Sequence, residues 1–313
     1  MSGFDRNSTG EDVAKVFADK IKGKTVIVTG VSQGLGLETA RVLAVYGAKV
    51  VLAGRNLSKL KATAETIKKD APDAVLKELV LDLSSLKAVR QAAEEVLKYS
   101  GPIDVVITNA GVMGTPYKKT VDGFELQFAA NHLGHFLFVN LIIPKLLESS
   151  APRVVLASSS AHHFGAVRFD DYGFQDGKSY DKWFAYGQSK SAVNLFGVEL
   201  AERYKNKIVV FSLHPGGATT NLHSQMTDED YTRFSDYYNP DGTPKGDWEC
   251  TIEQCTSTYL VAAFDPSIAN ETGGYLVDCK LAPEQAAAYS TDKDTAKKLW
   301  ALSEKLVGQK FDA

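Results

Sequence analysis

Cysteine is scarce in this sequence of 313 residues, which contains only Cys250, Cys255 and Cys279. Their number is odd, and none stands in the paired Cys-x-x-Cys spacing of a zinc site or a redox motif. A disulfide framework is therefore not expected. We expect free thiols, buried or half-buried, in a reducing compartment.

An excess of charge of one sign is also lacking. Lysine and arginine together number 35 and aspartate and glutamate 38, so the formal net charge is −3. A chain this balanced has no basic field that would attract a phosphate backbone. Nucleic acid is therefore not expected as a main partner.

Long hydrophobic runs are missing as well. Residues 1–24 are polar and charged and contain no apolar segment of a secretory signal. The most apolar stretch, Phe136 to Ile143, includes Asn140 and is followed by Pro144, far short of the roughly 20 residues that a membrane span needs. We therefore expect a cytoplasmic protein without a membrane anchor.

The sequence does contain a regular alternation of short β-branched runs and long amphipathic segments. The runs predict strands at 25–29, 49–53, 77–81, 103–108, 153–157, 208–213 and 275–277. The amphipathic segments predict helices at about 35–46, 57–69, 85–98, 122–148, 184–205 and 251–264. This order is typical of an α/β fold in which helices cover both faces of a parallel sheet. No linker divides the chain, so one domain is expected.

Two segments lie outside this alternation. Ser8-Thr9-Gly10-Glu11 has the capping-box pattern, which predicts a short helix in an N-terminal extension over residues 1–23. A connection near 221–250 is longer than compact domains usually allow, and such loops are often functional. We expect a lid over an apolar substrate, or else an interaction surface, built from aromatic residues: Tyr231, Phe234, Tyr237, Tyr238 and Trp248.

A glycine-rich turn follows the first predicted strand. Gly30, Gly34 and Gly36 have the spacing Gly-x3-Gly-x-Gly and open an amphipathic helix. Glycine permits the tight turn and lets backbone amides approach a pyrophosphate, while the helix N-terminus supplies positive potential. The turn therefore predicts a dinucleotide site that also includes its remaining residues, Ser32, Gln33 and Leu35.

The ends of the next two strands indicate which dinucleotide is bound. An NAD site prefers an acid after the second strand, but this chain has Arg55, which suits a 2′-phosphate and an adenine face. NADP(H) is the expected cofactor, although Arg55 would also suit a helix start at the surface. Asp82 and Leu83 follow the third strand at the adenine edge. Asp82 would equally serve as the N-cap of the helix that begins near Ser84.

Tyr186 and Lys190 lie four residues apart in one predicted helix and so share a helix face. An ammonium on that face favours the phenolate and would lower a phenol pKa that is ordinarily near 10. Such a phenol can donate a proton to a carbonyl oxygen, although the same spacing also occurs on solvated helices.

Three motifs occur here in one order: Thr29-Gly30-x3-Gly34-x-Gly36, Asn109-Ala110-Gly111 and Tyr186-x3-Lys190. Together they resemble the short-chain dehydrogenase/reductase family, from about residue 24 to residue 308. The segments 274–280 and 298–303 are similar to its retinol dehydrogenase-like and WW-domain oxidoreductase-like branch. The resemblance implies a Rossmann-type, doubly wound sheet of seven strands in a domain over residues 24–313.

The resemblance also implies the roles of single residues. Catalytic positions are Asn131, Ser159, Tyr186 and Lys190, with Ser158 and Ser160 as alternatives to Ser159. Ser159 would bind the substrate oxygen, Tyr186 would donate the proton, Lys190 would also hold the nicotinamide ribose, and Asn131 would hold a water. Cofactor positions are Asn109, Ala110, Gly111, Pro215, Gly216 and Thr220, with Thr219 as an alternative to Thr220.

The spacing between Ser159 and Tyr186 exceeds that of the smallest family members. The added segment, residues 163–182, would form a pocket wall or a packed surface flap through its aromatic residues: Phe164, Phe169, Tyr172, Phe174 and Tyr180. His132 and His135 lie three apart on a helix, but no cysteine or acid completes a ligand set, so no metal is expected.

The expected function is NADPH-dependent hydride transfer to a small apolar carbonyl compound, or from the corresponding alcohol. Such enzymes often form homodimers through the helix that carries Tyr186 and Lys190. The C-terminal tail would cover this helix and favour a monomer, so both a monomer and a homodimer are expected as alternatives. The alternative is a non-catalytic NADP(H)-binding protein that senses redox state or serves as a scaffold.

Overall fold

The computed structural model describes residues 3–243, 245 and 249–312 and contains one eight-stranded sheet, ordered β3-β2-β1-β4-β5-β6-β7-β8. The strands are β1 Thr25–Thr29, β2 Lys49–Gly54, β3 Leu76–Val80, β4 Val105–Thr108, β5 Arg153–Ala157, β6 Val209–His214, β7 Tyr275–Val277 and β8 Lys280–Leu281. The first seven are parallel, which confirms the doubly wound α/β fold. β8 pairs antiparallel with β7 and is an addition to the seven predicted strands.

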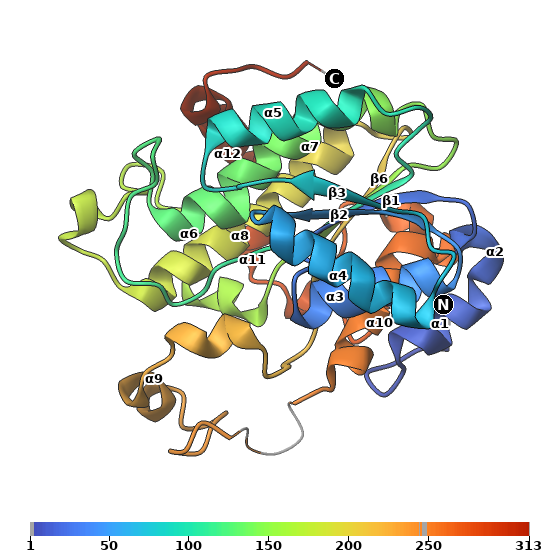
Figure 1. Ribbon diagram of the computed structural model, residues 1–313. Coiled ribbons are helices and arrows are strands. Elements are labelled where there is room, and N and C mark those ends of the chain that lie inside the picture. Colours follow the sequence, from blue (N-terminus) through green and yellow to red (C-terminus); the bar gives the residue numbers. More distant parts are fainter. Residues whose placement is uncertain (1–2, 244, 246–248, 313) are drawn as a thin grey trace.

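Helices cover both faces of the sheet (Figure 1). One core layer contains residues of α1 Gly10–Val16, α3 Gly34–Val45, α4 Leu57–Asp70 and α10 Ile252–Phe264. The other contains residues of α5 Leu86–Leu97, α7 Gly134–Leu146, α8 Lys182–Arg203 and α12 Lys293–Val307. The central strands β1, β4 and β5 are mostly apolar because both faces are buried, whereas the outer strand β3 contains Lys77 and Glu78 and is partly exposed.

Shorter helical segments connect these layers. They are α2 Ala18–Ile21, α6 Leu126–Phe128, α9 Asp228–Arg233 and α11 Ala288–Thr291, a π-helical turn at Ala129–Leu133, and 3₁₀ turns at Ser160–Phe164, Gln175–Gly177, Asn221–Gln225, Pro266–Glu271 and Pro283–Gln285. α9 belongs to the predicted lid and projects from the body of the molecule below α8 (Figure 1).

The N-terminal helix begins one residue later than predicted. Thr9, not Ser8, is the N-cap of α1, and its hydroxyl accepts a hydrogen bond from the amide of Asp12. The Asp12 carboxylate accepts in return from the Thr9 amide at 2.8 Å. An acid at the third helical position completes the box, so Asp12 takes the place that the sequence pattern gave to Glu11.

The predicted helix over residues 122–148 begins at Leu126 and continues past Pro144 to Leu146. Pro144 lies inside the helix, as the predicted range implies. Leu126–Leu146 is 21 residues long with mean hydropathy 1.3, which by length and composition is enough to cross a membrane. However, 89% of its most apolar window is buried inside the protein. Its apolar character is explained by its position between the sheet and its helical neighbours.

The C-terminal helix α12 packs on this buried helix and on α8. Trp300 meets Phe136 edge-on with ring centroids 5.0 Å apart and contacts Phe196 of α8 at 6.0 Å. The hydroxyl of Ser303 lies 2.7 Å from Nε2 of His132. The tail thus covers the helix that carries Tyr186 and Lys190.

Candidate active site

The predicted site residues gather at one edge of the sheet. β1 lies between β2 and β4, and the chain order of the strands reverses there. In open parallel sheets the crevice at such a point, beyond the carboxyl ends of the strands, is where ligands bind. Three turns meet at this edge because each follows a parallel strand: the glycine turn, residues 30–36, after β1, the Asn109 turn, residues 109–111, after β4, and the serine turn, residues 158–160, after β5.

The glycine turn has no room for side chains. Gly30 has φ +76°, and a Cβ there would lie 2.8 Å from Cα of Ala110. A Cβ on Gly36 would lie 2.4 Å from the carbonyl oxygen of Gly30. Gln33 is the N-cap of α3 but makes no side-chain capping hydrogen bond. The first amides of α3 therefore face an open turn, which suits the pyrophosphate of a dinucleotide.

Asn109 holds the glycine turn against β4. Its Nδ2 donates to the carbonyl oxygen of Thr29 at 3.0 Å, and its Oδ1 accepts from the hydroxyl of Tyr259 at 3.0 Å. Tyr259 lies on α10 and is buried. It was not among the predicted site residues, because nothing in the local sequence connects a tyrosine with an asparagine 150 positions away.

The adenine end is bordered by the turns after β2 and β3. Arg55 is exposed immediately before Asn56, the residue that caps α4. Asp82 accepts hydrogen bonds from the amide and hydroxyl of Ser84 at 3.0 and 2.7 Å. The N-cap of α5 is Ser85, so the alternative N-cap role of Asp82 is wrong: it closes the preceding turn. Leu83 is buried beside it.

The structure distinguishes among the three adjacent serines. The side chain of Ser159 lies close enough to the Tyr186 phenol to oppose the rise of its pKa. Ser158 is buried and donates instead to the backbone carbonyl of Lys190 at 3.1 Å, whereas Ser160 is exposed. Of the three, Ser159 is therefore the one in contact with the phenol.

The sequence of α8 brings Tyr186 to this position. Asp181 caps the helix by accepting from the amides of Trp183 and Phe184 at 2.8 and 2.9 Å. A Cβ on Gly187 would lie 2.7 Å from the carbonyl oxygen of Ala161, so glycine allows α8 to approach the turn after β5. This close approach brings the serine turn to the phenol.

The predicted lowering of the phenol pKa is not observed. Burial raises the pKa of Tyr186 to about 12, although the hydrogen bond with Ser159 opposes the shift. Lys190 donates to the carbonyl oxygen of Ala157 at 2.9 Å, and its Nζ lies 5.6 Å from the centroid of the Tyr186 ring. Burial lowers the pKa of Lys190 to about 8. Desolvation by burial is the main cause of both pKa shifts.

Asn131 lies in the π-helical turn, a feature that is frequent at functional sites. Its Oδ1 accepts from the amide of Val112 at 2.8 Å, and its Nδ2 donates to the carbonyl of Val112 and to the hydroxyl of Ser189, each at 2.9 Å. Asn131 therefore secures the turn that contains Gly111. A Cβ on Gly111 would lie 3.7 Å from Nζ of Lys190.

A buried histidine connects this turn with β1. Nδ1 of His135 donates to the carbonyl oxygen of Asn131 at 3.1 Å, and the hydroxyl of Thr29 donates to Nε2 at 3.0 Å. Burial lowers the pKa of His135 to about 4, so the ring is neutral near pH 7. Sequence reasoning expected no metal at His135 and did not connect this residue with the site. In the described residues, no three metal-ligating side chains gather into a possible ion site.

The loop after β6 closes over the glycine turn. A Cβ on Gly34 would lie 3.4 Å from Cγ2 of Thr220, and Asn221 donates to Oε1 of Gln33 at 2.6 Å. Thr219 is instead exposed and donates to Glu249 at 3.0 Å. Thr220 is thus the threonine that lies beside the glycine turn, and the loop from Pro215 brings the lid to the cofactor side of the crevice.

The predicted lid, the described part of residues 221–250, is apolar on the side that packs on the body of the molecule. Met113, Ala161, Trp183 and Tyr186 form a buried cluster on the body of the molecule. The lid adds Leu222, Met226 and Phe234, which are partly buried against it. We refer to these seven residues as the lid cluster. Its polar groups are the Tyr186 phenol and the indole nitrogen of Trp183, which is bonded to Asp230.

The predicted lid aromatics serve different purposes. Phe234 meets Trp183 edge-on at 4.7 Å, whereas Tyr231 and Tyr238 pack on each other at 5.5 Å. Tyr237 is exposed. Trp248, also predicted here, lies outside the described residues.

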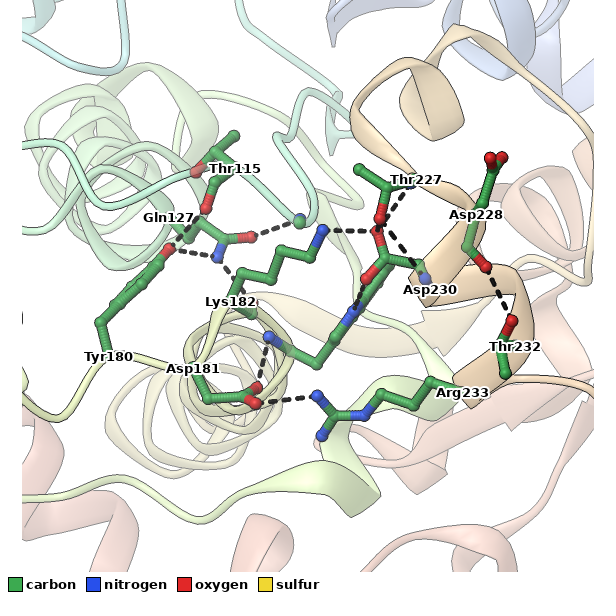
Figure 2. A network of polar contacts seen from close by, with 12 residues as sticks. Thr115, Gln127, Tyr180, Asp181, Lys182, Thr227, Asp228, Asp230, Thr232 and Arg233 are labelled. Carbon is green, nitrogen blue, oxygen red and sulfur yellow. Dashed lines mark hydrogen bonds and ion pairs between the residues drawn. The ribbon is translucent and has the colours of Figure 1, made fainter.

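Charged residues fasten the lid to the start of α8, as Figure 2 shows. Asp230 of α9 is buried and accepts from Nζ of Lys182 and, at 2.7 Å, from the indole Nε1 of Trp183. Arg233 pairs with Asp181 at 2.8 Å. Burial opposes ionisation, but the bonds from Lys182, Thr227 and Trp183 hold the pKa of Asp230 below its usual value. The carboxylate is charged near pH 7.

The segment 163–182 is anchored in the core and touches the predicted lid at both ends, through Phe164 and through Asp181 and Lys182. Phe174 is fully buried, and Tyr172 stacks on Phe128 at 5.9 Å. Tyr180 donates to the carbonyl of Thr115 at 2.9 Å, within the network of Figure 2. Among the five predicted aromatic residues, Phe164 is the one that meets a lid ring, and it stacks on Phe234 at 5.5 Å. Most of the segment is therefore a packed flap, and Phe164 alone extends the apolar wall.

A hydroxyl, a phenol and an ammonium beside a glycine turn at this sheet edge are the arrangement found in a known family. The model of the short chain dehydrogenase family matches residues 24–174. Human retinol dehydrogenase 13 is 38% identical over 294 residues, covering 92% of this chain and 86% of the relative. The chain belongs to the short-chain dehydrogenase/reductase family. Within it, the chain is retinol dehydrogenase-like.

Further relatives of this short-chain dehydrogenase/reductase agree with that assignment. Mouse retinol dehydrogenase 12 is 36% identical over 314 residues, covering 97% of this chain and 95% of the relative. A solved structure from Mycobacterium Paratuberculosis is 32% identical with TM-score 0.73, covering 95% and 98% of the two chains. A short chain dehydrogenase from Escherichia coli CFT073, complexed with NADPH, is 25% identical with TM-score 0.64, covering 84% and 99%. The protein is thus an oxidoreductase that uses a nicotinamide cofactor.

Proposed function

We propose that this short-chain dehydrogenase/reductase reduces apolar aldehydes or ketones with NADPH. The observation that carries the proposal is the neighbouring pair of Ser159 and Tyr186, whose phenol belongs to the apolar lid cluster. This pair offers two hydroxyl groups to one oxygen atom, and the surrounding side chains suit a ligand whose remaining surface is apolar.

Support for NADP(H) comes from this chain and from its relatives. Arg55 is exposed after β2, where a guanidinium suits a 2′-phosphate and an acid would suit NAD. Two of the similar solved structures hold NADP or NADPH. The glycine turn and the first amides of α3 would hold the pyrophosphate, and the Asn109 and Pro215 turns would border the ribose and nicotinamide.

The residues of the site have distinct roles in this proposal. The bound cofactor supplies the hydride. Ser159 donates a hydrogen bond to the substrate oxygen as negative charge develops there, and Tyr186 transfers its phenolic proton to the same oxygen. Lys190, held by Ala157, places its positive charge beside the phenolate that remains. Burial keeps the resting phenol protonated near pH 7, as a proton donor must be.

The relatives' names guide the choice of substrates. The curated relatives are retinol dehydrogenases, so we include retinal with shorter alkyl aldehydes and aromatic ketones in the substrate panel. A long apolar substrate would lie against Met113, Trp183 and Met226 of the lid cluster.

The test is NADPH oxidation over this panel by the wild-type protein and two variants. Tyr186→Phe removes the proton donor and should lower kcat at least about 100-fold, within the usual range for general acid catalysis. Tyr99→Phe removes a phenol at the end of α5 and should leave kcat unchanged. Wild-type turnover by Tyr186→Phe would show that the catalytic assignment is wrong.

A further inference from the structure

Two of the three cysteines lie together under the turn that follows β6. A Cβ on Gly216 would lie 3.0 Å from Sγ of Cys255 and 3.1 Å from Sγ of Cys250. Both sulfurs therefore border the same glycine. The two residues are five apart, with the start of α10 between them, and both are free. The sequence spacing gave no sign of this pairing because it is not a Cys-x-x-Cys motif.

The N-terminal extension adds a guanidinium to the pair. Nη2 of Arg6 donates to the carbonyl oxygen of Glu249 at 3.5 Å and to Sγ of Cys250 at 3.7 Å. The hydrogen bond from Cys255 and the charge of Arg6 lower the pKa of Cys250, against the effect of burial. The same hydrogen bond and burial raise the pKa of Cys255. One sulfur of the pair thus has thiolate character and the other remains a thiol.

Exposure distinguishes the same two sulfurs. Cys250 is 7% exposed and Cys255 is 0% exposed. A small oxidant from solvent therefore meets Cys250 first, and Cys255 lies behind it as a second thiol. This arrangement, a low-pKa cysteine next to a resolving cysteine, is that of oxidation-sensitive sites.

The third cysteine provides an internal comparison. Sγ of Cys279 lies 2.9 Å from the hydroxyl of Ser257 and 3.8 Å from that of Thr258. Burial raises the pKa of Cys279. Its neighbours are hydroxyls and not a guanidinium, so it is a structural thiol of low reactivity.

We propose that Cys250 and Cys255 are a reversible oxidation site for small hydroperoxides. The Cys250 thiolate attacks one peroxide oxygen: an S–O bond forms, the O–O bond breaks, and the other oxygen leaves as an alkoxide or hydroxide that takes a proton from water. Cys255 then loses its proton and attacks the Cys250 sulfur. The S–S bond forms, the S–O bond breaks, and the departing hydroxide takes the proton of Cys255 to become water.

The oxidation of the two thiols is a two-electron reaction. The two thiols lose two electrons to the peroxide, which is reduced to an alcohol or to water. A dithiol reductant restores the pair by thiol–disulfide exchange. In a reducing compartment such a disulfide is transient, as expected of a sensing site and not of a structural bridge.

Oxidation would reach the cofactor loop through the backbone. The amide of Cys250 donates to the carbonyl oxygen of Gly217 at 2.8 Å, and Glu249 is bonded to Thr219. An S–S bond of about 2.05 Å would draw together two sulfurs that now lie against Gly216. The loop from Pro215 to Thr220 would shift, and NADPH would bind less tightly. This last consequence rests on the proposed function.

The test exposes the full-length protein to a small excess of hydrogen peroxide and follows intact mass and mapped peptides. Wild type and Cys279→Ser should both lose two hydrogens through a bond between Cys250 and Cys255. Cys255→Ser should accumulate a Cys250 sulfenic acid, which a 1,3-dione traps. Cys250→Ser should do neither. Arg6→Gln should react several-fold more slowly because less thiolate is present.

Preferential oxidation of Cys279, loss of thiols without a bond between Cys250 and Cys255, or equal rates for Arg6→Gln and wild type would overturn the proposal. NADPH affinity, measured by fluorescence, should fall several-fold after oxidation and recover with dithiothreitol. An unchanged affinity would remove the coupling to the cofactor loop. If the reduced protein binds no NADPH, the proposed function is wrong. The mass measurement does not depend on NADPH and still tests whether Cys250 and Cys255 form a disulfide.

Discussion

The indole nitrogen of Trp183 donates a hydrogen bond of 2.7 Å to Oδ1 of Asp230, and this bond joins the lid to the helix that carries Tyr186. Asp230 also accepts from Lys182, the first residue of α8. The carboxylate is buried, so both bonds are charge-assisted in an environment with little water. Trp183 therefore packs in the lid cluster and also attaches the predicted lid to α8 through this hydrogen bond.

We predict that Asp230→Ala loosens the lid. Hydrogen bonds to a charged group contribute about 1.5–3 kcal/mol, so KM for an apolar substrate should rise roughly tenfold or more. kcat should change much less, because Ser159 and Tyr186 stay in place. The measurement is steady-state kinetics with the best substrate of the panel.

The matched control for the lid is Asp228→Ala, which removes an exposed carboxylate from the first turn of the same helix. It should leave KM unchanged. Equal kinetics for both variants would mean that the bonds of Asp230 do not hold the lid over the substrate.

We predict that NADPH affinity decreases as the pH rises through about 8. Burial lowers the pKa of Lys190 to about 8, so the free protein loses this positive charge above that pH. NADPH that prefers the charged form of Lys190 raises the pKa of Lys190 in the complex. Between the pKa of the free protein and that of the complex, the affinity for NADPH then falls by up to about tenfold per pH unit. NADPH fluorescence titrations from pH 7 to 9.5 measure it.

Lys190→Met provides the comparison for the pH effect. This variant should bind NADPH more weakly at pH 7 and show a nearly flat profile across the same range. A variant profile as steep as that of wild type would assign the titration to another group.

We predict that Arg55→Asp reverses the cofactor preference. The variant loses a guanidinium partner for the 2′-phosphate and gains a carboxylate that suits the 2′-hydroxyl of NADH. KM for NADPH should rise at least about tenfold, the effect of losing one charge-assisted bond, and kcat/KM for NADH should increase.

Lys61→Asp makes the same change of charge at an exposed residue of α4. It tests whether a change of net charge alone alters the binding of the two cofactors. It should leave the ratio of the two cofactors unchanged. If Arg55→Asp retains the wild-type ratio, Arg55 does not determine the choice.

We predict that Trp300→Ala strongly destabilises the fold. The indole is 2% exposed and packs on Phe136 and Phe196, so its removal leaves a cavity between α12, α7 and α8. The free energy of unfolding should fall by about 3–5 kcal/mol. Urea denaturation followed by circular dichroism measures this change.

Lys297→Ala, on the exposed side of α12, should change the free energy of unfolding by less than about 0.5 kcal/mol. A similarly small loss for Trp300→Ala would mean that α12 is not an integral part of the core.

Much of the architecture follows from local sequence patterns. Apolar runs predict the parallel strands because a strand buried on both faces excludes polar residues along its length. The spacing of Gly30, Gly34 and Gly36 predicts an open turn because a Cβ at Gly30 or Gly36 would collide with neighbouring backbone. The antiparallel strand β8 escaped prediction, since two residues carry no periodic signal.

The sequence by itself determined which groups stand near each other along the chain. Tyr186 and Lys190 share a helix face, and the serine turn follows β5, whatever the rest of the molecule does. Tertiary structure alone paired Asn109 with Tyr259, joined Asp230 to Trp183 and brought Arg6 to Cys250. It also decided the pKa of Tyr186. Contacts between distant segments and the depth of burial depend on how the layers pack, and no local pattern encodes either of them.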